Sequence, residues 1–131
     1  MKRALRGVIR TGEEPLLEGW GDPLTRKLSW ITLFSSDITP TDGMTAGIAE
    51  ILPGAGRGRL HRHKEAEIYY IIEGSGMMLL NGEETAVGPG ASVFIPGDAL
   101  HGLRNTGEGV MKLFYVFPTG CFSDVVYHFA D

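Results

Sequence analysis

Two histidines separated by one residue, His61 and His63, begin the stretch of this chain that is best suited to chemistry. Side chains alternate between the two faces of an extended strand, so both imidazoles point the same way. Glu67 and Tyr69 fall on the same face if the register continues through the bend at residues 64–66. We therefore expect two imidazoles, a carboxylate and a phenol to converge on one volume.

A third imidazole decides between two interpretations of this pair. On a surface strand, an HxH pair can be nothing more than two solvated histidines. His101, however, comes from a separate apolar segment about forty residues later, GPGASVFIPGDALHGLRN. Three imidazoles and a carboxylate form a ligand set for a transition metal, since nitrogen donors suit Zn, Cu, Fe and Ni and the carboxylate brings Mn within range. We expect one divalent transition metal (Mn, Fe, Ni, Co or Zn) to be held by His61, His63, Glu67 and His101.

The spacing of these residues resembles the two sequence motifs of the cupin superfamily. Four residues match the first motif: His61, His63, Glu67 and Gly74. Four more match the second motif: Gly90, Pro96, His101 and Asn105. Ala55 and Asp98 stand where the motifs usually have a further glycine. Together the motifs cover residues 54–105, and this resemblance implies the cupin fold, a double-stranded β-helix or jelly-roll barrel.

A closer resemblance is to the small single-domain cupins that include the dimethylsulfoniopropionate lyases. It extends from about residue 43 to residue 129, through the stretches GIAEILPG, HRHKEAEIYYIIEG, FIPGDALHGLRNTG and FYVFPTGCFSDVVYHF. In those lyases a metal orients the substrate carboxylate and a tyrosine that matches Tyr69 removes the α-proton. A second tyrosine, matching Tyr127, lies near the sulfonium end, and elimination gives dimethyl sulfide and acrylate. The resemblance thus implies catalytic roles for Tyr69 and Tyr127.

Residue chemistry alone leaves the neighbours of the histidines open to two interpretations each. A phenol beside a divalent cation is biased toward phenolate from its usual pKa of about 10, which makes Tyr69 a candidate general base. Tyr69 can equally be a core aromatic whose hydroxyl finds a hydrogen-bond partner. Arg59 shares the parity of His61 and can bind a substrate carboxylate, or it can be solvated. A positive charge at Arg59 does not favour a sulfonium substrate. His128 has the opposite parity to Tyr127, so we expect it to be exposed.

Composition limits the partners and the setting. The 131 residues suffice for one domain with a sizeable core but are too few for two. A net charge of -4 gives no electrostatic reason to expect nucleic acid or an anionic membrane as a partner. The single cysteine, Cys121, excludes an intrachain disulfide, and no long apolar run predicts a signal peptide or membrane span. A reducing, cytoplasmic setting is the simpler expectation.

Short apolar runs punctuated by glycine and proline predict an all-β chain. The predicted strands cover residues 28–34, 44–52, 67–73, 77–80, 91–95, 110–117 and 124–129. Asn81-Gly82 between two apolar runs predicts a hairpin turn. No segment longer than a turn has helical periodicity with caps at both ends. We assign residues 1–42 to an N-terminal arm with edge strands and residues 43–131 to the barrel, all within one domain. The arm and the exposed strands favour a homodimer.

We therefore expect a metal-dependent enzyme that acts on a small-molecule carboxylate, and the resemblance implies a lyase-like β-elimination. An Fe-dependent oxygenase or a sugar or uronate isomerase can use the same ligands. A non-enzymatic small-molecule-binding cupin is a further alternative. A closed structural metal is disfavoured because such sites are usually tetrahedral and rich in thiolates.

Overall fold

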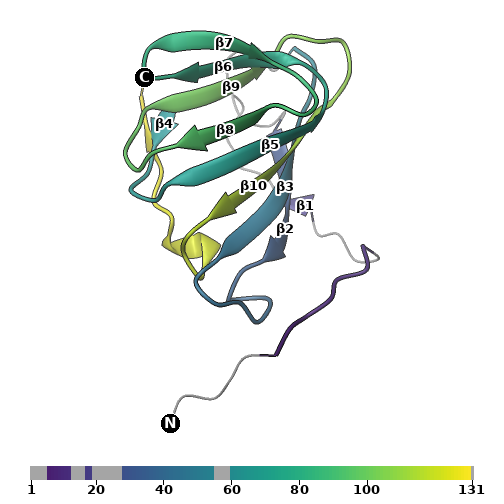
Figure 1. Ribbon diagram of the computed structural model, residues 1–131, viewed down its shortest axis with the longest axis vertical. Coiled ribbons are helices and arrows are strands. Elements are labelled where there is room, and N and C mark those ends of the chain that lie inside the picture. Colours follow the sequence, from purple (N-terminus) through teal and green to yellow (C-terminus); the bar gives the residue numbers. More distant parts are fainter. Residues whose placement is uncertain (1–5, 13–16, 19–27, 55–59, 131) are drawn as a thin grey trace.

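The apolar runs of the sequence form strands that are arranged in two facing antiparallel sheets (Figure 1). The computed structural model describes residues 6–12, 17–18, 28–54 and 60–130. In this part of the chain the helical structure is a single 3-10 turn, η1 (Phe122–Asp124). The predicted all-β jelly roll is therefore confirmed. No helix among the described residues is long and apolar enough to cross a membrane.

The two sheets differ in size, with six strands in the larger and five in the smaller. The larger sheet has, in spatial order, β1 (Leu17–Glu18), β2 (Leu28–Phe34), β3 (Thr45–Ile51), β10 (Met111–Phe117), β5 (Glu67–Glu73) and β8 (Ser92–Ile95). The smaller sheet has β11 (His128–Phe129), β4 (His61–Arg62), β9 (His101–Asn105), β6 (Gly76–Leu80) and β7 (Glu83–Val87). Strands close in space, such as β3 and β10, lie far apart in the sequence, as a jelly roll requires.

Most of the strands predicted from apolar runs are present. The bounds of β2 and β5 are as predicted, and β3, β6, β8 and β10 differ from the prediction by one residue at one or both ends. Asn81 and Gly82 both have positive φ, +55° and +80°, and join β6 to β7 as the predicted hairpin turn. The prediction of a strand over residues 124–129 was wrong, because Asp124 ends η1, residues 125–127 are not in a strand and β11 has only two residues.

The core lies between the two sheets and is formed mainly by the side chains that point inward from the strands. Every second residue of β10 is buried, which places Met111, Leu113, Tyr115 and Phe117 inside. Each fully buried large apolar side chain contributes about 1.5–3 kcal/mol. This packing fixes β10 beside β5, the strand that carries Glu67 and Tyr69, and so holds one wall of the interior in register.

Candidate metal centre

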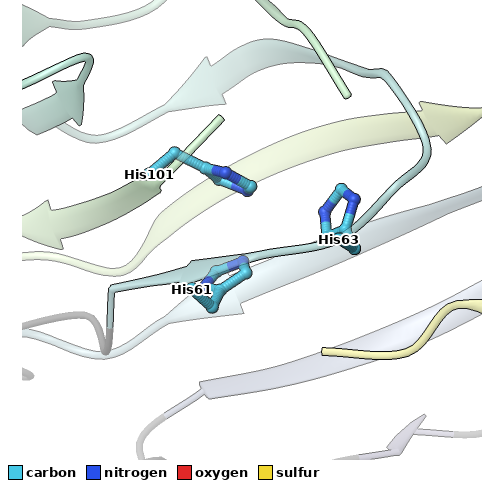
Figure 2. Close-up of side chains that lie close together, drawn as sticks. All are labelled: His61, His63 and His101. Atoms are coloured by element: carbon cyan, nitrogen blue, oxygen red, sulfur yellow. The ribbon is translucent and has the colours of Figure 1, made fainter. Parts of the chain in front are cut away.

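Three buried imidazoles meet between β4 and β9. His61 on β4 lies directly opposite His101 on β9 in the antiparallel register, and His63 follows immediately after β4. One ring nitrogen from each of the three histidines lies within 4.8 Å of the other two. Figure 2 shows the three rings gathered in one place from these separate segments. The predicted convergence of His61, His63 and His101 is therefore present.

Hydrogen bonds to the backbone set the orientation of two of these rings. Nδ1 of His63 lies 2.9 Å from the carbonyl oxygen of Glu65, and Nδ1 of His101 lies 2.8 Å from that of Ala99. A carbonyl oxygen can only accept a hydrogen bond, so each Nδ1 is the donor and carries the proton. In the neutral rings the lone pair is then on Nε2, which is the arrangement that metal-binding histidines use.

The carboxylate of Glu67 lies beside the imidazoles of His63 and His101, and together they form a group of hydrogen-bond acceptors that a cation would satisfy. Its Oε1 lies 3.1 Å from Nε2 of His63 and 3.6 Å from Nε2 of His101. A carboxylate oxygen and an unprotonated Nε2 are both acceptors, so they need a proton or a cation between them. Nε2 of His101 is buried and has no hydrogen-bond partner among the described residues. A divalent metal ion would satisfy all three acceptors together, and in this sense the residues fit a metal.

The charge of Glu67 also affects His63. Desolvation lowers the pKa of His63, but the hydrogen bond and negative charge of Glu67, with smaller contributions from Glu65, outweigh it and raise the pKa. Metal binding requires neutral imidazoles, so a bound cation competes with this proton.

Two tyrosine rings border the three imidazoles, and they neighbour different histidines. The Tyr69 ring centroid is 6.4 Å from that of His101. The Tyr127 centroid is 5.1 Å from that of His61 and 5.3 Å from that of His63. Arg59, the predicted carboxylate-binding residue, lies outside the described residues. His128 is exposed, as its parity predicted.

Both phenols are held in their neutral form by their surroundings. Desolvation is the largest effect and raises the pKa of Tyr69 well above 10, and the negative charge of Glu67 adds to it. The pKa of Tyr127 is raised in the same way, first by burial and then by Glu67. Tyr69 as a whole residue is half-buried. Without a nearby positive charge, neither phenol is a base at neutral pH.

Two residues near this centre were missed from the sequence. Tyr115 on β10 is 5% exposed and pairs directly with Tyr69 on β5. The alternation of apolar residues along β10 was the signal that could have placed it inside. Glu65 is 8% exposed, and its Oε1 has no hydrogen-bond partner among the described residues. Its negative charge contributes to the raised pKa of His63 and to that of Tyr127. No sequence signal separates such a buried glutamate from a solvated one.

Asn105 of the second motif has a structural role here. Its Nδ2 donates to the carbonyl oxygens of Ile51, at 2.8 Å, and Gly109, at 2.9 Å, and its Oδ1 accepts from the Gly107 N–H at 2.9 Å. The side chain is buried. Asn105 thus ties the turn after β9 to the end of β3, and its place in the motif reflects the fold rather than the chemistry.

The loop after β8 supports the segment that carries His63. The Asp98 N–H donates to the His63 carbonyl oxygen at 2.7 Å. Asp98 has φ +65°, in the left-handed region, which explains why glycine is usual at this motif position. At the preceding Gly97, a Cβ would overlap the carbonyl oxygen of Lys64. The close approach of these two backbones therefore sets the position of His63.

We expect Gly97→Ala to destabilise the fold by about 1–3 kcal/mol, because the added methyl group forces the two backbones apart. Gly88→Ala is the matched control, since the nearest atom to a Cβ there is 4.0 Å away. Urea unfolding followed by circular dichroism measures both changes. Equal stability of the two variants would contradict the proposed contact between the loops.

Comparisons with known proteins agree with this geometry. A family model described as the cupin domain matches residues 47–117. The dimethylsulfoniopropionate lyase DddW of Ruegeria pomeroyi is 35% identical over 113 residues, which cover 86% of this chain and 73% of that protein. Among solved structures, Rru_A2000 from Rhodospirillum rubrum, a cupin-2 domain, superposes with a TM-score of 0.76 at 20% identity, covering 99% of this chain and 84% of that one. The polyketide cyclase RemF from Streptomyces resistomycificus gives a TM-score of 0.71 at 25% identity, covering 88% and 80%. The family match and the sequence relative together show that this chain belongs to the cupin superfamily.

Proposed function

We propose that this cupin is a metal-dependent carbon–sulfur lyase that eliminates a thioether from a small carboxylate with a cationic end, with dimethylsulfoniopropionate as the first candidate. The observation that carries the proposal is the position of two tyrosines at the border of the three imidazoles, Tyr69 beside His101 and Tyr127 beside His61 and His63. The 35% identity to DddW supports it, since that relative is a dimethylsulfoniopropionate lyase.

The residues that would hold the metal are the three histidines and Glu67. When bound, a divalent ion would polarise an oxygen of the substrate carboxylate, and its charge would lower the pKa of a neighbouring phenol. In the metal-free chain Tyr69 keeps its proton, because burial and Glu67 raise its pKa. The proposed base activity of Tyr69 therefore depends on occupancy of the site.

Tyr69 is the residue proposed to move the proton. Its phenolate oxygen takes the hydrogen on the carbon next to the substrate carboxylate. The electron pair of that C–H bond forms the new C=C bond, and the bond between the β-carbon and sulfur breaks. The sulfur keeps the pair from the broken bond and leaves as a neutral thioether, and the unsaturated carboxylate remains. The step consumes neither water nor an oxidant.

The surroundings of Tyr127 suit the cationic end of such a substrate. The Tyr127 ring stacks with that of Phe129 at a centroid distance of 6.1 Å, and the Phe122 centroid lies at 6.3 Å. Aromatic faces attract cations, and the Glu65 carboxyl near Tyr127 adds negative charge. The Oε1 of Glu65 is buried and has no hydrogen-bond partner among the described residues, so we propose that Glu65 acts on the positive group of the substrate through its charge. The negative charge of Glu65 opposes the repulsion that a positively charged Arg59 would exert on a cationic substrate.

We expect Glu65→Gln to raise the KM for dimethylsulfoniopropionate about 10–100-fold, because the substitution removes a negative charge that attracts the sulfonium group in a partly buried site. The kcat should change less, because Glu65 acts on the bound end and not on the reacting carbon. Glu83→Gln, at an exposed position on β7, is the matched control. An unchanged KM in Glu65→Gln would remove Glu65 from substrate recognition.

The function itself is tested by measuring dimethyl sulfide release. The chain is purified without chelator and assayed with dimethylsulfoniopropionate in separate Mn, Fe, Co, Ni and Zn forms, with the metal-free chain as the blank. Release that depends on the metal supports the proposal. Absence of release with every metal would reject the lyase and favour an anionic substrate bound through Arg59.

An Fe-dependent oxygenase or an isomerase using the same ligand set is the second candidate. It is supported by the donor set, because imidazoles and a carboxylate also bind iron. Dioxygen uptake by the Fe form with small carboxylates, or their isomerisation, in the absence of dimethyl sulfide release would support this alternative.

A further inference from the structure

The end of the chain places two aromatic rings on the same face as the three imidazoles. Exposure alternates there: Val126 and His128 are exposed, whereas Tyr127 and Phe129 are half-buried. Phe129 lies directly opposite His61 in the antiparallel pairing of β11 with β4. Figure 1 shows this C-terminal segment, in yellow, beside β4. The rings of Tyr127 and Phe129 therefore share the side of the sheet that carries His61.

Phe129 neighbours both a proposed metal ligand and the tyrosine proposed for the sulfonium end. Its ring centroid is 5.8 Å from that of His61 and 6.1 Å from that of Tyr127. The planes of the Phe129 and Tyr127 rings differ by 18°, so the two rings stand nearly parallel. Alkyl groups on a sulfur held beside Tyr127 therefore lie next to the ring of Phe129.

The other phenylalanine beside Tyr127 has a different role. Phe122 packs against the buried Trp30 at a centroid distance of 5.8 Å and against the buried Phe117 at 6.1 Å. These contacts make Phe122 part of the core. Phe129 borders His61 instead, which leaves it as the apolar wall between the metal centre and Tyr127.

Backbone pairing fixes the position of this wall. Phe129 pairs with His61, and the N–H of the next residue, Ala130, donates to the carbonyl oxygen of Leu60 at 2.9 Å. Moving the Phe129 backbone away from the site would break this pairing of β11 with β4. A substrate with larger alkyl groups therefore meets a wall that does not yield easily.

We propose that Phe129 determines which alkyl groups the sulfonium end of the substrate can carry, and that it restricts them to small groups such as methyl. The inference rests on the proposed lyase function and adds to it a substrate class, the short-chain dialkylsulfonium carboxylates. Attraction between an aromatic face and a cation depends on the charge, which dimethyl and diethyl sulfonium groups share. A fixed apolar wall does separate them, because one methylene group in an apolar pocket changes kcat/KM about 10–200-fold.

Competition between two substrates in one reaction tests the role of Phe129. The metal-loaded full chain receives equal concentrations of dimethylsulfoniopropionate and diethylsulfoniopropionate, and the headspace ratio of dimethyl sulfide to diethyl sulfide is measured. This ratio equals the ratio of the two kcat/KM values, so the fraction of folded, metal-loaded enzyme cancels. A variant that only loses stability or metal releases less of both thioethers but keeps the wild-type ratio.

We expect the wild type to prefer the dimethyl substrate at least about 100-fold, and Phe129→Ala to reduce this preference at least about 10-fold. Phe129→Leu keeps an apolar side chain in β11 and should give an intermediate ratio. Phe94→Ala is the matched control and should keep the wild-type ratio, since Phe94 is 61% exposed on β8 and pairs with the exposed Ile68.

The outcomes separate this inference from the proposed function on which it rests. Release of both thioethers with the same ratio in the wild type and in both Phe129 variants would keep the lyase and overturn the role of Phe129. A wild type without preference, or an equal change of the ratio in Phe94→Ala, would also overturn that role. Absence of both thioethers with every metal form would overturn the lyase itself, and the inference with it.

Discussion

Replacing His61, His63 or His101 with alanine is expected to lower the bound metal to well below half of the wild-type content. Each change removes one of four proposed donors, and the buried gap that remains offers water few partners to hold it in the lost position. Any metal-dependent turnover should fall with the metal. The measurement is the metal content per chain, by mass spectrometry of protein purified without chelator.

His128→Ala is the matched control for this series. His128 is exposed on β11, next to the same strand that carries His61, and its loss should leave the metal content unchanged. Because His101 is fully buried, His101→Asn is a second variant that keeps a polar side chain there while removing the ring. Circular dichroism of each variant separates loss of metal from loss of fold. Wild-type metal content in all three alanine variants would refute the ligand assignment.

The sequence predicted those strands that have a continuous apolar pattern. β2 and β5 were located at their observed bounds because most of their residues are apolar or aromatic and pack against neighbours on at least one face. β7 was missed because its outward and inward residues are mostly exposed and polar. β4 has only two residues, too few for any periodicity, yet it carries His61. One of the strands that position the site, β4, is thus among those with the weakest pattern.

For the site, the alternation of side chains along a strand predicted more than the amino-acid composition did. Alternation from His61 correctly placed His63 and Glu67 inside, in spite of the bend between β4 and β5. The pairing of strands that lie far apart in the sequence could not be predicted from this alternation. The direct pairing of His61 with His101, and of Tyr69 with Tyr115, depends on the order of strands in each sheet. The burial of Glu65 could not be predicted either, because it depends on packing around the bend and not on its neighbours in the sequence.

Tyr69→Phe is expected to slow turnover about 10²–10⁴-fold if Tyr69 is the general base, because the reaction loses its positioned proton acceptor. The ring remains, so its packing beside His101 and against Tyr115 should be preserved. The cost in stability should be no more than a lost hydrogen bond, about 0.5–1.5 kcal/mol. Metal content should stay at the wild-type level, since Tyr69 is not among the proposed ligands. Turnover is measured with saturating dimethylsulfoniopropionate in the metal form that is most active.

Tyr70→Phe supplies the comparison that separates the two roles of a tyrosine on β5. Tyr70 is the next residue on the same strand, but it points outward and is 49% exposed, so its hydroxyl cannot reach the substrate. A similar loss of activity in both variants would indicate a general effect on β5 and not proton transfer at Tyr69. Turnover that persists unchanged in Tyr69→Phe would keep the elimination but reject Tyr69 as the base. The role of base would then pass to Tyr127, whose ring borders His61 and His63. Burial and Glu67 raise the pKa of Tyr127 as well, so it too needs a nearby positive charge to act as a base.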